Sequence, residues 1–181
     1  MKGIKHYLKN VKEEFKRTKD NPFEVDLQAP FDQFIFAMKD GGHYFALDIN
    51  VVVKNRFIFY DEQFKRCRIL ISEYILWFFE EHLKIDNPSL AAKAEQAISD
   101  IKHAKSNGQV TIVPVNGKHD LAQLGLNSKN TIDVIVGTYL KKQVEIQKQF
   151  GVWKKVVFIV DPNDVHSFHV AKEYGLDTYI L

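Results

Sequence analysis

The sequence has few of the features that mark secreted, membrane-bound or nucleotide-binding proteins. Its single cysteine, Cys67, cannot form an intramolecular disulfide, which fits a reducing compartment. The first residues run into charged sequence with no apolar signal core, and no apolar stretch is long enough to span a bilayer. The only adjacent glycines, Gly41 and Gly42, precede a predicted strand, whereas a glycine-rich phosphate loop follows one. We therefore expect a cytoplasmic protein without a membrane contact or a nucleotide cofactor.

A strong excess of charge of one sign is also missing. Lysine and arginine number 25 against 23 aspartates and glutamates, so the net charge is +2. That value does not identify a nucleic-acid-binding protein, although it is compatible with a local basic patch. Hydrophobic residues make up 45% of the 181 residues and include 14 phenylalanines, which indicates one globular domain with a well-filled core.

The order of apolar segments predicts an α/β fold. Short runs rich in β-branched and aromatic residues indicate buried strands, and segments with helical periodicity lie between them. Strands are expected at 44–53, 68–72, 110–113, 156–160 and 178–181, and helices at 73–83, 88–106, 131–150 and 164–174. This alternation predicts a three-layer domain whose mostly parallel, five-stranded sheet is flanked by helices. The domain would span 43–181, with residues 1–42 as an N-terminal helical extension packed on it.

The N-terminal extension begins with a basic, amphipathic segment. Ile4, Leu8, Val11 and Phe15 share one helical face, and lysines occupy much of the remainder. The segment either docks on the domain through its apolar stripe or lies near a phosphate backbone.

Acidic residues follow several of the predicted strands. Asp48 lies either after the first strand or within its end, Glu73 follows the second, and Asp161 and Asp164 follow the fourth. Asp133 lies in the first turn of the long helix after the third strand. Because ligands of open parallel sheets bind beyond the carboxyl ends of the strands, these carboxylates are expected along one edge.

Converging carboxylates favour a cation. They would raise one another's pKa unless a positive charge neutralises them, and oxygen-only ligands suit Mg²⁺ or Mn²⁺. Such ions can activate water and stabilise the oxygens of a phosphodiester under attack. The alternative for each single acid is that it is only the N-cap of the next helix.

Three segments together resemble the PIN-domain nucleases over residues 43–181. Asp48 and Asn50 after an apolar strand are similar to the opening motif of that family, and Asp133 leading a helix is similar to its third motif. The strand at 156–160 followed by Asp164, Ala171 and Gly175 resembles the closing segment. The resemblance implies the strand order 3-2-1-4-5, an acidic pocket holding Mg²⁺ or Mn²⁺, and cleavage of single-stranded RNA. Many members of the family are toxins neutralised by a small antitoxin partner, and others process ribosomal or messenger RNA.

The resemblance assigns roles to particular residues. Asp48, Asp133 and Asp164 would be catalytic metal ligands, with Asp161 as the alternative to Asp164. The acid of the second motif would be either Glu73 or Glu80, the first as a catalytic carboxylate and the second as a metal ligand. The nuclease interpretation requires the carboxylates of Asp48, Asp133 and Asp164 to lie close enough to share one ion or an adjacent pair of ions.

Two departures from the family pattern keep other functions open. Ile49 and Pro162 stand where the family usually has hydroxyl residues. A PIN-like domain that has lost catalysis would serve as an RNA-binding or protein-interaction module, and homo-oligomerisation is compatible with either function. An unrelated receiver-like domain would use one aspartate as a phosphoacceptor, but no lysine follows the fourth strand as it does there. The aromatic and basic residues between Phe57 and Arg68 would either stack bases and hold phosphates or pack in the core.

Overall fold

The computed structural model describes residues 25–83 and 88–181, and its five strands form one parallel sheet. The predicted helix with Ile4, Leu8, Val11 and Phe15 lies outside the described residues. The strands occur in the order β3-β2-β1-β4-β5, which confirms the predicted fold class and the expected strand order. The bounds of the strands are β1 Tyr44–Leu47, β2 Arg68–Ser72, β3 Val110–Val113, β4 Val156–Val160 and β5 Asp177–Ile180.

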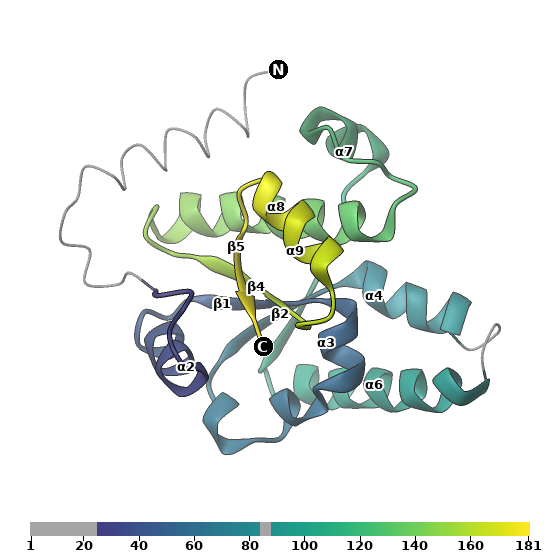
Figure 1. The fold of residues 1–181 in the computed structure, drawn as a ribbon, viewed down its shortest axis with the longest axis horizontal. Coiled ribbons are helices and arrows are strands. Elements are labelled where there is room, and N and C mark those ends of the chain that lie inside the picture. Colours follow the sequence, from purple (N-terminus) through teal and green to yellow (C-terminus); the bar gives the residue numbers. More distant parts are fainter. Residues whose placement is uncertain (1–24, 84–87) are drawn as a thin grey trace.

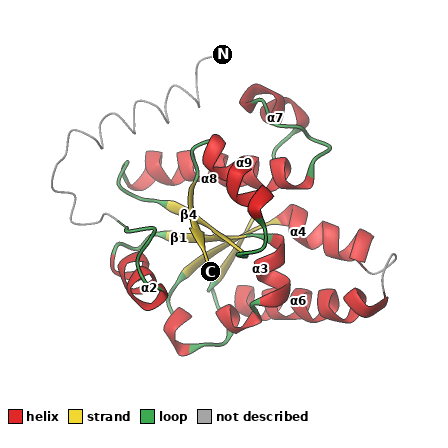
Figure 2. Cartoon of the chain, viewed as in Figure 1, coloured by secondary structure: helices red, strands yellow, loops and turns green. Residues whose placement is uncertain are grey.

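Helices cover both faces of this sheet, as Figures 1 and 2 show. Helices α8 and α9 lie over one face, and α2, α3 and α6 lie over the other (Figure 1). The described helices are α2 Phe31–Asp40, α3 Ile49–Lys54, α4 Glu73–Phe78, α6 Pro88–Ser106, α7 Lys118–Leu124, α8 Thr131–Phe150 and α9 Val165–Glu173. Short 3₁₀ helices at Arg56–Phe59 and Glu62–Phe64 and a π-helical turn at Phe79–Leu83 complete the list. In the part of the chain that is described, no helix is both long and apolar enough to cross a membrane.

The core lies between the sheet and its two helical layers. Every residue of β4 is buried, as expected for a central strand of a parallel sheet covered on both faces. Helix α2 belongs to the same core, because Phe34 and Met38 are fully buried. The Phe34 ring stacks on Tyr179 of β5 at a centroid distance of 3.8 Å, so α2 is packed against the edge strand of the domain.

The prediction that the first strand extends to residue 53 was wrong. The strand ends at Leu47, and Ile49–Lys54 is helix α3, on which Val51 and Val52 are buried. A run of valines does not by itself distinguish a buried strand from a short buried helix. The Asp48 side chain decides between them, because it accepts a hydrogen bond from the Asn50 N–H and begins the helix as its N-cap.

Candidate functional site

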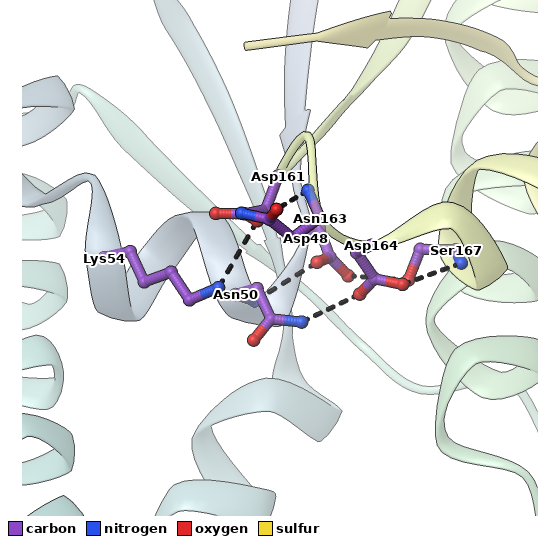
Figure 3. Close-up of polar contacts among 7 residues, drawn as sticks. All are labelled: Asp48, Asn50, Lys54, Asp161, Asn163, Asp164 and Ser167. Carbon is purple, nitrogen blue, oxygen red and sulfur yellow. Dashed lines mark hydrogen bonds and ion pairs between the residues drawn. The ribbon is translucent and has the colours of Figure 1, made fainter.

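Asp48 and Asp164 begin two helices that leave the sheet toward opposite faces. Asp48 is the N-cap of α3 after β1, and Asp164 is the N-cap of α9 after β4. Strands β1 and β4 are adjacent, and the connections from β1 and from β4 lead to opposite sides of the sheet. Ligands of open α/β sheets bind at this kind of topological switch point, beyond the carboxyl ends of the strands. The two carboxylates point toward one another there (Figure 3).

The Asp48 carboxylate is fully buried. Its Oδ2 accepts the Asn50 N–H at 3.2 Å, and its Oδ1 accepts the Ser167 hydroxyl at 3.4 Å. Burial, followed by the negative charge of Asp164, raises the pKa of Asp48 to about 7. Asp48 therefore exchanges a proton in the neutral range, where an ordinary aspartate is fully ionised.

Asp164 is the ionised member of the pair. Its burial by itself would raise the pKa, but hydrogen bonds outweigh this effect and hold the pKa of Asp164 below its usual range. The Ser167 N–H donates to Oδ1 at 3.0 Å, and the Asn50 side-chain amide donates to Oδ2 at 2.7 Å. The pKa values of the two carboxyls are thus displaced in opposite directions, which is typical of paired acids in functional sites.

Asp161 lies beside the pair but has a partner of its own. Its Oδ1 accepts the Asn163 N–H at 3.0 Å and pairs with the Lys54 ammonium at 3.3 Å (Figure 3). Burial opposes ionisation, but these contacts lower the pKa of Asp161. Lys54 is half exposed, so the ion pair forms one rim of the site.

The Tyr139 hydroxyl fixes the ends of β1 and β2 next to the site. It donates to the Leu47 carbonyl at 2.8 Å and accepts the Ser72 N–H at 3.0 Å. The side chain is fully buried on α8, and burial raises its pKa far above the usual range. Tyr139 thus holds the residue before Asp48 and the residue before Glu73 at one point.

The Asp133 carboxylate has a hydrogen-bond partner in the loop before α8. Its Oδ2 accepts the Asn127 N–H at 2.7 Å, which closes the loop before α8. In the described part of the chain, no hydrogen bond or ion pair connects Asp133 to Asp48 or Asp164.

Glu73 and Glu80 lie together in a shallow groove of about 490 Å³. Both carboxylates are exposed, and the groove is completed by Tyr74, Leu76, Trp77 and Val115. Neither Asp48 nor Asp164 lines it. The two candidates for the second motif therefore share one surface.

The oxygen-only character of the pair fits Mg²⁺ or Mn²⁺ better than Zn²⁺. Mg²⁺ is commonly held by one or two carboxylates while it keeps several waters, so Asp48 and Asp164 would suffice as protein ligands. Within residues 25–83 and 88–181, no three histidine, cysteine, aspartate or glutamate side chains form a group that could enclose a metal. The pair therefore fits an open site in which the ion keeps several waters, and not a closed structural site.

Sequence reasoning missed two residues of the site. Ser167 lies three residues after Asp164, the spacing at which a helix N-cap accepts a backbone N–H, so its position is readable from the sequence. Lys54 follows Asp48 by more than one turn of a helix that the sequence presented as a strand, and that error concealed it. Tyr139, which supports the site from α8, was not identified from the sequence either.

The fold and the acidic pair define a class: an all-parallel α/β domain with two unlike carboxylates at the topological switch point. No protein-family model and no curated protein matches this sequence.

Proposed function

We propose that the protein is a Mg²⁺- or Mn²⁺-dependent nuclease that cleaves single-stranded RNA. The observation that carries the proposal is the convergence of Asp48 and Asp164 at the carboxyl ends of adjacent strands β1 and β4. The resemblance of three sequence segments to PIN-domain ribonucleases supplies the substrate class.

In this proposal Asp48 and Asp164 hold the ion. A bound divalent metal would supply Lewis acidity toward the phosphate and help to activate water. Asn50 and Ser167 orient Asp164 through their hydrogen bonds of 2.7 and 3.0 Å, so that its two oxygens keep fixed directions. Lys54 keeps Asp161 neutralised, so this third carboxylate adds little repulsion against a phosphate.

A second function has support of its own: a PIN-like module that binds RNA or a protein without cutting. It is favoured by the engagement of Asp133 with Asn127, because among the described residues Asp133 does not join Asp48 and Asp164 in a group of three metal-ligating acids. Both functions use the same fold and differ in chemistry.

The experiment that separates them is cleavage of an end-labelled, mixed-sequence, single-stranded RNA in Mn²⁺. Wild type is compared with Asp48→Asn, with an EDTA control and with Asp120→Asn. Asp120 pairs with Lys141 on the surface, so this variant loses an aspartate of no proposed role. Cleavage by wild type and by the Asp120 variant, abolished by EDTA and by Asp48→Asn, supports the nuclease. Folded wild-type protein that binds the RNA and leaves it intact supports the non-cutting module.

A further inference from the structure

A group of aromatic and basic residues lies at the amino ends of the central strands, on the edge of the sheet opposite Asp48. Arg68 begins β2 and Tyr44 begins β1, and the two residues are partners in the parallel register. Tyr44 also pairs with Val156 of β4, and Trp153 and Lys154 come directly before that strand. With Arg66, these residues form what we call the amino-edge surface: Tyr44, Arg66, Arg68, Trp153 and Lys154.

The cations of the amino-edge surface lack acidic partners in the part of the chain that is described. Arg68 donates to the Tyr44 hydroxyl at 3.1 Å and lies over that ring at 5.4 Å. Lys154 donates to the carbonyls of Gly41 and Gly42 and lies 4.1 Å from the centre of the Trp153 ring. None of Arg66, Arg68 and Lys154 forms an ion pair with a described carboxylate.

Two nearby acids are already paired with other lysines. Glu62 pairs with Lys65, and Asp177 pairs with Lys155 at 3.2 Å. The positive charge of the amino-edge surface is therefore uncompensated by these neighbours. Burial, followed by the positive charge of Arg68, lowers the pKa of Lys154, as expected for two cations that lie near one another.

Two left-handed backbone conformations shape the amino-edge surface. Gly42 has a φ of +58°, and a Cβ at this position would lie 2.7 Å from the Lys154 ammonium. The glycine therefore lets the lysine head reach the turn. Arg66 adopts a φ of +70°, which is uncommon for a residue with a side chain, and it is exposed. An anion bound here would relieve the repulsion between the cations.

We propose that the amino-edge surface binds the phosphate backbone of a single-stranded nucleic acid, whose bases would stack on the partly exposed rings of Tyr44 and Trp153. Arginine presents its donors in a fork that matches phosphate, and within the described part of the protein Arg68 donates a hydrogen bond only to Tyr44. Cations interleaved with aromatic rings are the combination that single-strand binders use. This inference goes beyond the proposed cleavage and does not rest on it, because it concerns the opposite edge of the sheet.

The test is binding of a fluorescent oligouridine of about 12 nucleotides, a length within the range of single-strand sites. Anisotropy is measured in EDTA, so that no metal-dependent cleavage interferes, and over a series of salt concentrations. Wild type is compared with the double variant Arg66→Asn/Arg68→Gln and with Lys141→Gln/Lys142→Gln. The lysine double variant loses the same number of positive charges as the arginine double variant. Its two lysines form ion pairs with acids on another surface.

We expect the arginine double variant to bind about tenfold more weakly and to lower the salt slope by about 1.4, the loss of two phosphate contacts. The lysine double variant should bind like wild type. In a Trp77→Phe background, oligouridine should also change the fluorescence of Trp153.

Equal losses in both double variants would overturn the proposal, as would wild type that fails to bind at low salt. Arginine-dependent binding of phosphatidylserine vesicles without binding of oligouridine would also overturn it, in favour of a membrane contact.

Discussion

The side-chain amide of Asn50 donates to the Asp164 carboxylate at 2.7 Å, and this hydrogen bond joins the helix that follows β1 to the helix that follows β4. It is also one of the hydrogen bonds that make the two acids of the pair differ. Asp164 receives donors from two elements, whereas burial dominates at Asp48. Asp164 is therefore the acid that carries the negative charge, because its hydrogen bonds stabilise the ionised form.

The first prediction concerns stability against pH without metal. The Asp48 carboxyl has a pKa of about 7 in the folded protein and an ordinary value of 3.8. Between these values the folded state holds a proton that the unfolded chain has released, so raising the pH favours unfolding. The full difference corresponds to about 4 kcal/mol from this group alone. Asp164 has the opposite pH dependence. Because its pKa is lowered in the folded state, it stabilises the fold while it is ionised, and this stabilisation is lost as the pH falls through that pKa.

Denaturant unfolding from about pH 4 to about pH 8 in EDTA measures this dependence. Asp48→Asn keeps a capping oxygen and removes the titration, so its profile should lose the decline and exceed wild type at the alkaline end. Asp161→Asn is the control, because the pKa of Asp161 is lowered and its removal should not produce that gain. Parallel profiles for wild type and Asp48→Asn would contradict the assignment.

The second prediction concerns metal binding. Mn²⁺ should stabilise wild type by about 2.7 kcal/mol when its concentration is one hundred times the dissociation constant. Asp48→Asn and Asp164→Asn should each lose most of this gain, because each removes one of two proposed ligands. Thermal unfolding with and without Mn²⁺ gives the measurement. An equal increase in Tm for wild type and both variants would place the ion elsewhere on the protein.

The third prediction concerns the buried hydroxyl of Tyr139. Tyr139→Phe leaves the Ser72 N–H and the Leu47 carbonyl without this partner in a dry interior, at an expected cost of about 1–3 kcal/mol. Tyr174→Phe is the matched control, because its hydrogen bond to the Gly125 carbonyl is exposed and its loss should cost less. Chemical denaturation of both variants makes the comparison, and equal costs would contradict the special role of Tyr139.

The fourth prediction separates backbone strain from steric contact at Gly42. Gly42→Ala should lose about 1–2 kcal/mol from its left-handed backbone, plus the cost of displacing the Lys154 ammonium. Gly108→Ala has a φ of +73° with open space around the new Cβ, so it reports the backbone cost alone. Unfolding free energies of the two variants should differ, and Lys154→Met should remove that difference. If the difference persists with methionine, Lys154 is not its cause.

Much of the fold was readable from the sequence because periodicity and turn residues agree over most of the chain. The strand at 156–160 and the helix at 131–150 are examples, and both lie where the pattern placed them. Residues 50–53 were mispredicted because their β-branched side chains favour a strand. In the structure β1 has already ended, and the buried Asp48 side chain caps a helix over these residues.

The candidate site was only partly readable. The pairing of Asp48 with Asp164 depends on the adjacency of β1 and β4, and the predicted topology supplied it. The direction of the Asp133 side chain depends on a loop N–H six residues earlier, which no periodicity reveals. Glu73 and Glu80 line the same groove because of the direction in which α4 leaves the sheet, and the sequence pattern does not give that direction.

Because Asp48 and Asp164 each begin a helix, selection for folding alone would preserve a side chain that can cap at both positions, either aspartate or asparagine. Under the proposed nuclease function, a lineage that abandoned cleavage would keep a capping side chain at both positions, whereas acids with no capping role of this kind would be free to change. Glu80, exposed in its groove, is such a residue. Among natural variants of this chain, residue 80 should therefore vary without a capping constraint, whereas residues 48 and 164 should stay aspartate or asparagine.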